Sequence, residues 1–282
     1  MLSRQCVGQF VLVASLSLVA VAADQAKKEF KYTVGPQAFI SILNEYGPVT
    51  VKPSNGNQVI ITAIPHSDKV EVDDSKNGDR IELRSHLLKG ATPDNGIVEY
   101  EVVAPLDARI AVHSNNGPLR GEQLRGDLSF EGDTAAVELH DIVTPHLHVN
   151  TLNGAVTLTN VIGHIEVDSV GGDVTLNSVT GPYVSATTTS GKIHYNGDFG
   201  VGGDYKLSTH SGEVVALVPA GASLDVNAYS VRGDVENDFP LTKKHFGISL
   251  PKGARSLFGT AGSATSSVLI RTFSGKILFK KR

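Results

Sequence analysis

Hydrophobic and polar positions alternate along most of the second half of the chain. Val156 and Leu158 flank one polar threonine, and Val174 and Leu176 flank another. A period of two indicates strands with one buried face. These runs end at glycine or small polar residues, where strands commonly turn. No stretch after residue 24 has helical periodicity, so the pattern predicts an all-β protein.

The alternating segments are punctuated by a repeat with two kinds of beat. The first kind, Ser/Thr-x-x-Gly-x-aliphatic, occurs seven times, with its glycine at Gly117, Gly154, Gly172, Gly191, Gly212, Gly233 and Gly275. The second kind, hydrophobic-x-Gly, ends at Gly126, Gly163 and Gly181. Two beats make a unit of about 18–21 residues. The unit around Ala135 is degenerate, because it has Gly132 where the hydroxyl residue should be.

Such a unit predicts a parallel β-solenoid, a β-helix or β-roll with two short strands per coil. One unit cannot bury its apolar face alone, whereas stacked units bury it as a continuous column. Equivalent positions would lie about 4.8 Å apart, which places Val156, Val174 and Ile193 in a row. An antiparallel sandwich is the alternative. A sandwich, however, gives no reason for a hydroxyl residue to recur seven times three positions before glycine.

Both ends of the repeat differ from its middle. Residues 30–110 lack the beat and contain longer strand-like runs with Asn-Gly turn signals at Gly56 and Gly78, which predicts an antiparallel β cap. The β-solenoid is expected over residues 111–282. Within it, residues 237–270 break the pattern and are expected to form an irregular loop. The basic tail, residues 280–282, should blunt an edge strand.

The first 23 residues have the three parts of a signal peptide. Arg4 precedes an apolar stretch that ends in Ala20-Val21-Ala22, a small-residue cleavage pattern. An uncleaved membrane anchor is the alternative, although the apolar run is short for that purpose. We therefore expect an exported protein with no membrane span after signal removal, located in the periplasm, at the cell surface or outside the cell. Cleavage would remove Cys6, the one cysteine.

Charge excludes one class of partner. The 282 residues carry a formal net charge of −4, with a pI near 6.2. Nucleic-acid-binding domains are typically basic, so no nucleic-acid partner is expected.

One group of side chains is a candidate metal site. His146 and His148 alternate on one predicted strand, and His164 and Glu166 occupy the matching positions one unit later. Stacking would place His146 beside His164, and His148 beside Glu166, about 4.8 Å apart. Three imidazoles and a carboxylate could hold zinc or another divalent ion. The alternative is a solvent-facing surface that is rich in histidine, and we expect no cofactor.

Several segments resemble a known family. They are the closing run Thr272–Phe279, the segments 259–262 and 268–270 before it, and Val103-Ala104-Pro105. They are similar to the bacterial putative adhesin family, exported β-strand-repeat proteins that constitute a domain of unknown function. The resemblance spans about residues 35–282. It implies adhesion, but its motifs are structural and assign no functional residue.

No catalytic motif such as G-x-S-x-G, H-E-x-x-H or a P-loop is present. The sequence thus predicts a non-enzymatic adhesion or scaffold module of the cell envelope, whose partner is an extracellular or envelope polymer or a protein. A carbohydrate-active enzyme on a β-helix, such as a polysaccharide lyase or hydrolase, is one alternative. It would need a groove with paired carboxylates or an Arg or Lys base. An envelope-stress signalling accessory is the other alternative.

Overall fold

The computed structural model describes residues 27–244 and 250–282. Every regular element in these residues is a strand, and the strands join into one open sheet. The prediction of an all-β protein is confirmed. The predicted signal peptide, residues 1–23, lies outside the described residues. Within the described ranges, no helix has the length and apolar character needed to span a bilayer.

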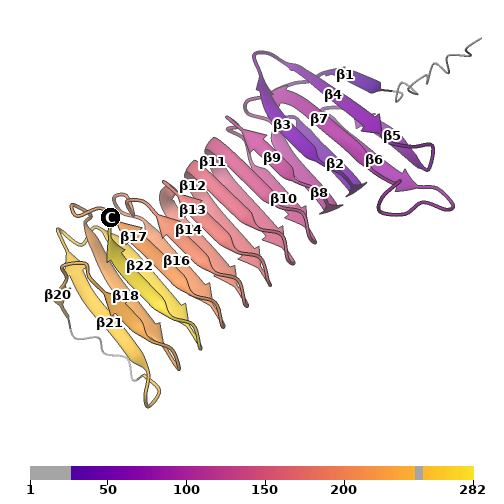
Figure 1. Cartoon of the computed structure of the whole chain (residues 1–282). Coiled ribbons are helices and arrows are strands. Elements are labelled where there is room, and N and C mark those ends of the chain that lie inside the picture. The colour runs from indigo at the N-terminus through magenta and orange to yellow at the C-terminus, as the bar shows by residue number, and fades with distance from the viewer. Residues whose placement is uncertain (1–26, 245–249) are drawn as a thin grey trace, which may run out of the picture.

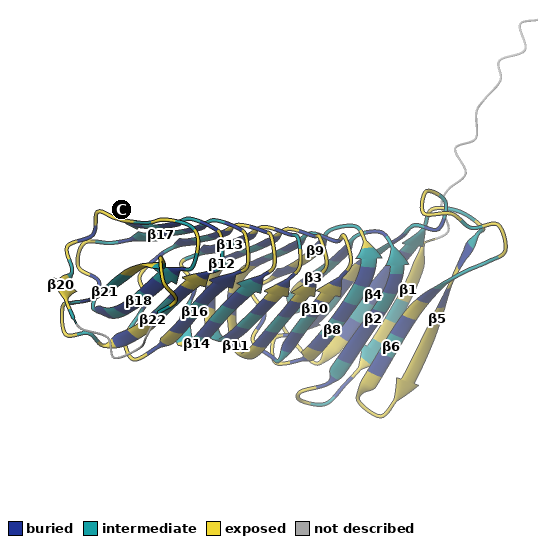
Figure 2. Cartoon of the chain, turned by 90° about the horizontal axis from the view of Figure 1, so that it is seen from below, coloured by how far each residue is buried: buried dark blue, intermediate teal, exposed yellow. Residues whose placement is uncertain are grey.

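Most strands lie in two columns, which form the two long layers of the molecule (Figures 1 and 2). In spatial order, column A contains β2 (Phe39–Tyr46), β8 (Arg109–Asn116), β10 (Leu128–Gly132), β11 (Val137–Thr151), β12 (Val156–Ser169), β14 (Thr180–Thr188), β16 (Asp204–Thr209), β22 (Ser266–Thr272) and β18 (Leu224–Ser230). Column B contains β3 (Val49–Ser54), β9 (Leu119–Glu122), β13 (Val174–Asn177), β15 (Ile193–Asn196), β17 (Val214–Val218), β23 (Ile277–Lys281) and β19 (Val235–Asn237). The long strands β11 and β12 contribute one half to each column, and all neighbours within a column are parallel.

The strand register stacks like residues on like. Val156 pairs with Val174, and Val174 pairs with Ile193, as the repeat predicts. All three side chains are fully buried between the two layers. Figure 2 shows buried positions alternating with intermediate or exposed ones along most strands of the columns. The core is therefore a continuous row of aliphatic side chains that runs the length of the molecule.

The corner between the columns explains the Ser/Thr-x-x-Gly beat. The hydroxyl oxygens of Ser169 and Thr188 accept hydrogen bonds from the backbone N–H groups of Gly172 and Gly191, at 3.0 and 3.1 Å. A Cβ on Gly191 would lie 2.0 Å from the carbonyl oxygen of Gly172 in the adjacent unit. Glycine is required because the backbones of successive units touch here, and the hydroxyl satisfies a buried corner N–H.

The N-terminal region is only partly the antiparallel cap that the sequence predicts. Strands β6 (Arg80–Leu87) and β7 (Val98–Pro105) run parallel to β2 and β3, which themselves run parallel to β8 and β9. The antiparallel pairs of this region are made by the outer strands β1 (Lys28–Thr33), β4 (Gln58–Pro65) and β5 (Val70–Asn77): β1 pairs with β4, β4 with β7, and β5 with β6. The parallel pairing thus extends well before residue 111.

A variant of the corner motif at Asn44 accounts for this difference. Asn44 pairs with Ser114 of the next unit, and its side-chain amide donates to the carbonyl of Gly47 at 3.1 Å. Val49, two residues after that glycine, pairs with Leu119. The segment from Asn44 to Val49 is therefore a further copy of the beat, with asparagine in place of the hydroxyl residue.

The C-terminal units do not stack in chain order. Strands β22 and β23 insert between β16–β17 and β18–β19. The predicted irregular loop at 237–270 instead contains β20 (Thr242–Lys243), β21 (Arg255–Ala261) and the start of β22; β21 lies antiparallel on the outer edge of β18. An antiparallel strand makes no parallel corner, so the beat is absent there. Strand β23 is not an edge strand over Ile277–Phe279, which pair with both β17 and β19, whereas Lys280 and Lys281 of the basic tail pair with β17 alone.

Candidate functional site

Outward-pointing side chains of column A form rows that cross the strands. One row comprises Phe39, Arg109, Asp127, His146, His164 and Tyr183, from β2, β8, the residue before β10, β11, β12 and β14. We call its last five members the rim. Each strand contributes one rim residue, so neighbouring rim residues are about 4.8 Å apart.

The four residues of the predicted metal site lie where the repeat placed them. His146 pairs with His164, and His148 pairs with Glu166. The rings of His146 and His164 are 5.2 Å apart, and Nε2 of His164 lies 3.2 Å from Oε1 of Glu166. Among residues 27–244 and 250–282, however, no group of three or more His, Cys, Asp or Glu side chains is arranged to hold a metal ion.

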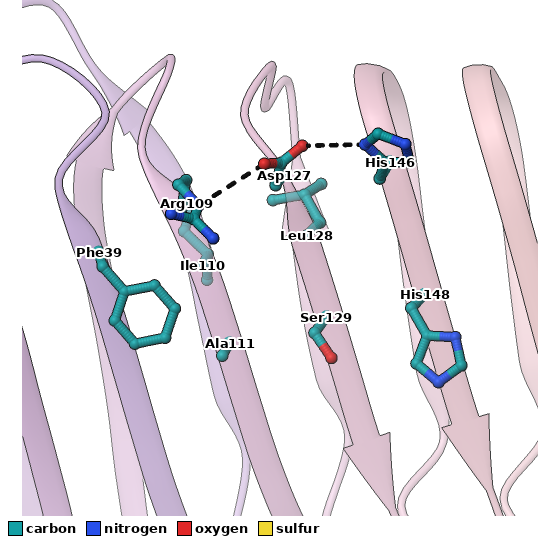
Figure 3. Close-up of a pocket in the computed structure, with 9 residues that line it drawn as sticks. All are labelled: Phe39, Arg109, Ile110, Ala111, Asp127, Leu128, Ser129, His146 and His148. Carbon is teal, nitrogen blue, oxygen red and sulfur yellow. Dashed lines mark ion pairs between the residues drawn. The ribbon is translucent and has the colours of Figure 1, made fainter.

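Instead, the histidines make contacts along the rim. His146 Nδ1 is 3.5 Å from Oδ1 of Asp127, whose Oδ2 is 3.6 Å from Nε of Arg109 (Figure 3). His164 stacks on Tyr183 with ring centroids 4.8 Å apart. Each rim side chain thus contacts a neighbour, through charged groups at the Arg109 end and through aromatic rings at the Tyr183 end.

A hollow of about 150 Å³ lies beside the first part of the rim. We call it the trough; its nine lining residues are drawn in Figure 3. The small side chains of Ala111 and Ser129 form its floor, between Phe39 at one end and His148 at the other. Phe39 and His148 are separated by three strand spacings, or about 14 Å. The trough exists because two adjacent strands carry small residues at the same register position.

Cation–π contacts hold the aromatic end of the trough. The guanidinium carbons of Arg80 and Arg109 lie 4.5 and 5.8 Å from the centroid of the Phe39 ring. Phe39 is half-buried between these two charges, which fix its orientation. Sequence reasoning missed the trough, since Phe39 lies in the segment that lacks the glycine beat.

Other hollows lie away from this row. One, of about 240 Å³, is at the corner and is lined by residues that include Glu131, Asp133 and Leu152. Another, of about 180 Å³, lies on column B beside Lys52 and Arg120. The trough differs from both in adjoining a row of polar side chains that continues along column A.

Two of the tyrosines with raised pKa values belong to the interior. Burial raises the pKa of Tyr195 and of Tyr205 above the ordinary value of 10.0. The Tyr195 hydroxyl oxygen lies 3.1 Å from the backbone carbonyl oxygen of Val179 and 2.9 Å from that of Asp198, and the hydroxyl donates to these acceptors. Tyr195 also stacks on Phe199, 4.3 Å away. These phenols therefore fill and tie together the core.

Comparisons with known proteins place this arrangement in a family. Residues 38–279 match the family described as Toastrack DUF4097. A putative adhesin from Bacteroides fragilis NCTC 9343 is similar in structure, with 11% identity, a TM-score of 0.49, and coverage of 92% of this chain and 98% of that chain. A putative adhesin from Parabacteroides distasonis ATCC 8503 has 15% identity and a TM-score of 0.41. A putative lipid binding protein from the same strain has 8% identity and a TM-score of 0.42. Both matches cover 92% of this chain and 98% of the other chain. No curated protein matches the chain.

Proposed function

The chain belongs to the Toastrack DUF4097 family, and on that premise we propose that it is a non-enzymatic adhesion module of the bacterial cell envelope. It is a putative-adhesin-like domain of unknown function. We infer that its two columns are the two faces of a parallel β-solenoid, exported by the leader at residues 1–23. The outward face of column A is the surface that binds its partner.

The observation that carries this proposal is the row of polar and aromatic side chains on column A. Five consecutive strands present one rim residue each, in register, beside the trough. A partner that extends across the strands would meet one polar or aromatic side chain at every strand. Repeat proteins use long, regular surfaces in this way to bind extended partners. The row therefore favours a polymer over a compact small molecule.

The composition of the trough favours binding over hydrolysis. Asp127 is the one acid among its nine lining residues. Glycoside hydrolysis ordinarily uses two carboxyl groups on opposite sides of the bond that is cut. Asp127 is also engaged by Arg109 and His146. Its role in this arrangement is to order the rim.

Cosedimentation tests the proposal. The chain from residue 24 onward is mixed with insoluble envelope polymers, such as peptidoglycan sacculi, with insoluble polysaccharides, and with immobilised matrix proteins. We expect saturable binding to at least one of them, with no release of reducing ends or unsaturated sugars. Product release would establish the enzyme alternative. The absence of binding to every polymer would overturn the proposal. Fractionation of cells that express the full chain tests export.

A further inference from the structure

The trough and the rim together indicate a class of partner. Resting on the proposed function, we propose that this site binds a chain of neutral sugars that lies across the strands of column A. The trough accommodates the first sugars and the rest of the rim contacts those that follow.

The spacing of the rim suits a polymer of pyranose units. Rim residues recur at each strand, about 4.8 Å apart, which is close to the length that one sugar ring adds to an extended glycan. Arg109, Asp127, His146, His164 and Tyr183 would therefore each face one successive sugar. A repeating ligand can then make one hydrogen bond at every strand.

The chemistry of the rim suits hydroxyl groups. Arg109 only donates hydrogen bonds and an ionised Asp127 only accepts them, whereas histidine and tyrosine can do both. A sugar hydroxyl is both donor and acceptor, so it can satisfy each of these side chains in turn. Phe39, at the end of the rim, and Ala111, beside the rim, give the trough an apolar surface. Sugar rings present the same combination, with hydroxyls at the edge and C–H groups on the face.

The rim is also ordered before any ligand arrives. Two ion pairs join Arg109, Asp127 and His146, and ring contacts join His146, His164 and Tyr183. Binding loses less conformational entropy when the contacting side chains are already held. This matters for a shallow site, because each sugar contributes only a few contacts.

Other classes of partner fit the site less well. A peptide strand that binds by main-chain pairing needs a free sheet edge, but β8 and β10 are each paired on both sides. A lipid chain would cover the charged rim without hydrogen-bonding to it, which is unfavourable. A polyanion would meet Asp127 and Glu166, both of which are partly exposed.

The test combines a filled trough, a shortened rim side chain and a matched control. Ser129→Leu fills the trough floor, and Asp127→Ala removes the acceptor at the centre of the ion-pair chain. Thr175→Leu is the control, because Thr175 points outward on column B, away from the site. Affinity electrophoresis would use a β-1,3-glucan, hydroxyethyl cellulose and yeast α-mannan as neutral probes. The comparison probes are polygalacturonate, phosphatidylglycerol vesicles and a matrix protein free of mucin.

We expect the parent chain and Thr175→Leu to bind at least one neutral glycan equally. Ser129→Leu should weaken that binding by about tenfold or more. Raising the salt from 0.05 to 0.5 M should leave the affinity nearly unchanged, because no net charge pairing is involved. Circular dichroism confirms that each variant remains folded.

Four results would overturn the inference. Neutral glycan binding that survives Ser129→Leu and Asp127→Ala places the site elsewhere. Binding of polygalacturonate or vesicles alone, lost at high salt, assigns a different partner class. Binding of matrix protein without any glycan does the same and leaves the proposed adhesion function standing. Failure to bind any probe, including the envelope polymers named above, removes both proposals together.

Discussion

Replacing Gly191 by alanine tests the close contact between successive units at the corner. The added Cβ would lie 2.0 Å from the carbonyl oxygen of Gly172 and 2.6 Å from its carbon. Carbon–oxygen contacts are ordinarily about 3.3 Å or longer, so the two backbones would have to separate by about 1.3 Å. The contacted atoms are backbone, and a rotamer change cannot relieve the overlap.

The expected cost follows from overpacking. Extra carbon atoms in a packed site cost about 1–3 kcal/mol, and a backbone contact lies at the upper end of that range. Alanine also makes the unfolded chain less flexible than glycine does, which raises the free energy of unfolding by about 0.4–1 kcal/mol. The net loss is about 2 kcal/mol, which lowers the Tm of a chain of this length by about 4–8 °C.

The assay is thermal and urea unfolding followed by circular dichroism, with Gly221→Ala as the matched control. A Cβ on Gly221 meets nothing within 4 Å, so that variant should unfold within about 0.5 kcal/mol of the parent. Neither glycine has a backbone conformation that alanine avoids. If Gly191→Ala and Gly221→Ala unfold alike, the close contact is not what requires glycine at the corner.

Three further predictions follow from the packing. Val174→Asp should prevent folding, because it buries a charge at a cost of several kcal/mol. Thr175→Asp should fold, because the side chain at position 175 points outward. Equal melting of the two variants would show that Val174 does not point inward. Removing residues 266–282 should expose the amides of the unit at 224–237 to rapid hydrogen exchange, because β22 and β23 connect that unit to the rest, and retained protection would contradict this. Stability should fall as pH rises above 10, the ordinary pKa of a tyrosine, because the unfolded chain loses phenolic protons that burial retains in the folded state; Tyr195→Phe should make urea unfolding less sensitive to pH in that range, and an unchanged slope would argue against its burial.

The interior and the neighbours on column A could be read from the repeat. When parallel units stack in register, residues that are one repeat apart in the chain become neighbours in the structure. The row of Val156, Val174 and Ile193 and the pairing of His146 with His164 were therefore predictable residue by residue. The contact of His146 with Asp127 was not predicted, although Asp127 follows Gly126 as His164 follows Gly163, because the sequence interpretation extended the row from the histidines only toward the later units.

The ends were harder to predict for two different reasons. At the N-terminal end, Asn44 performs the task of the hydroxyl residue, so a search restricted to serine and threonine missed one copy of the beat. At the C-terminal end, the unit that contains Thr272 has a regular beat, but its sequence does not indicate which two units it lies between. A strand pairs equally well with any unit that presents the same corner and the same inward residues.

The amino-acid sequence alone determined the strands, their buried faces and the composition of each corner, because these depend on residues a few positions apart. The tertiary structure alone decided the order of the last units and the existence of the trough. The trough brings Phe39 of an early unit beside Ala111, Ser129 and His148 of three later ones. That juxtaposition arises from stacking between units, which local periodicity does not encode.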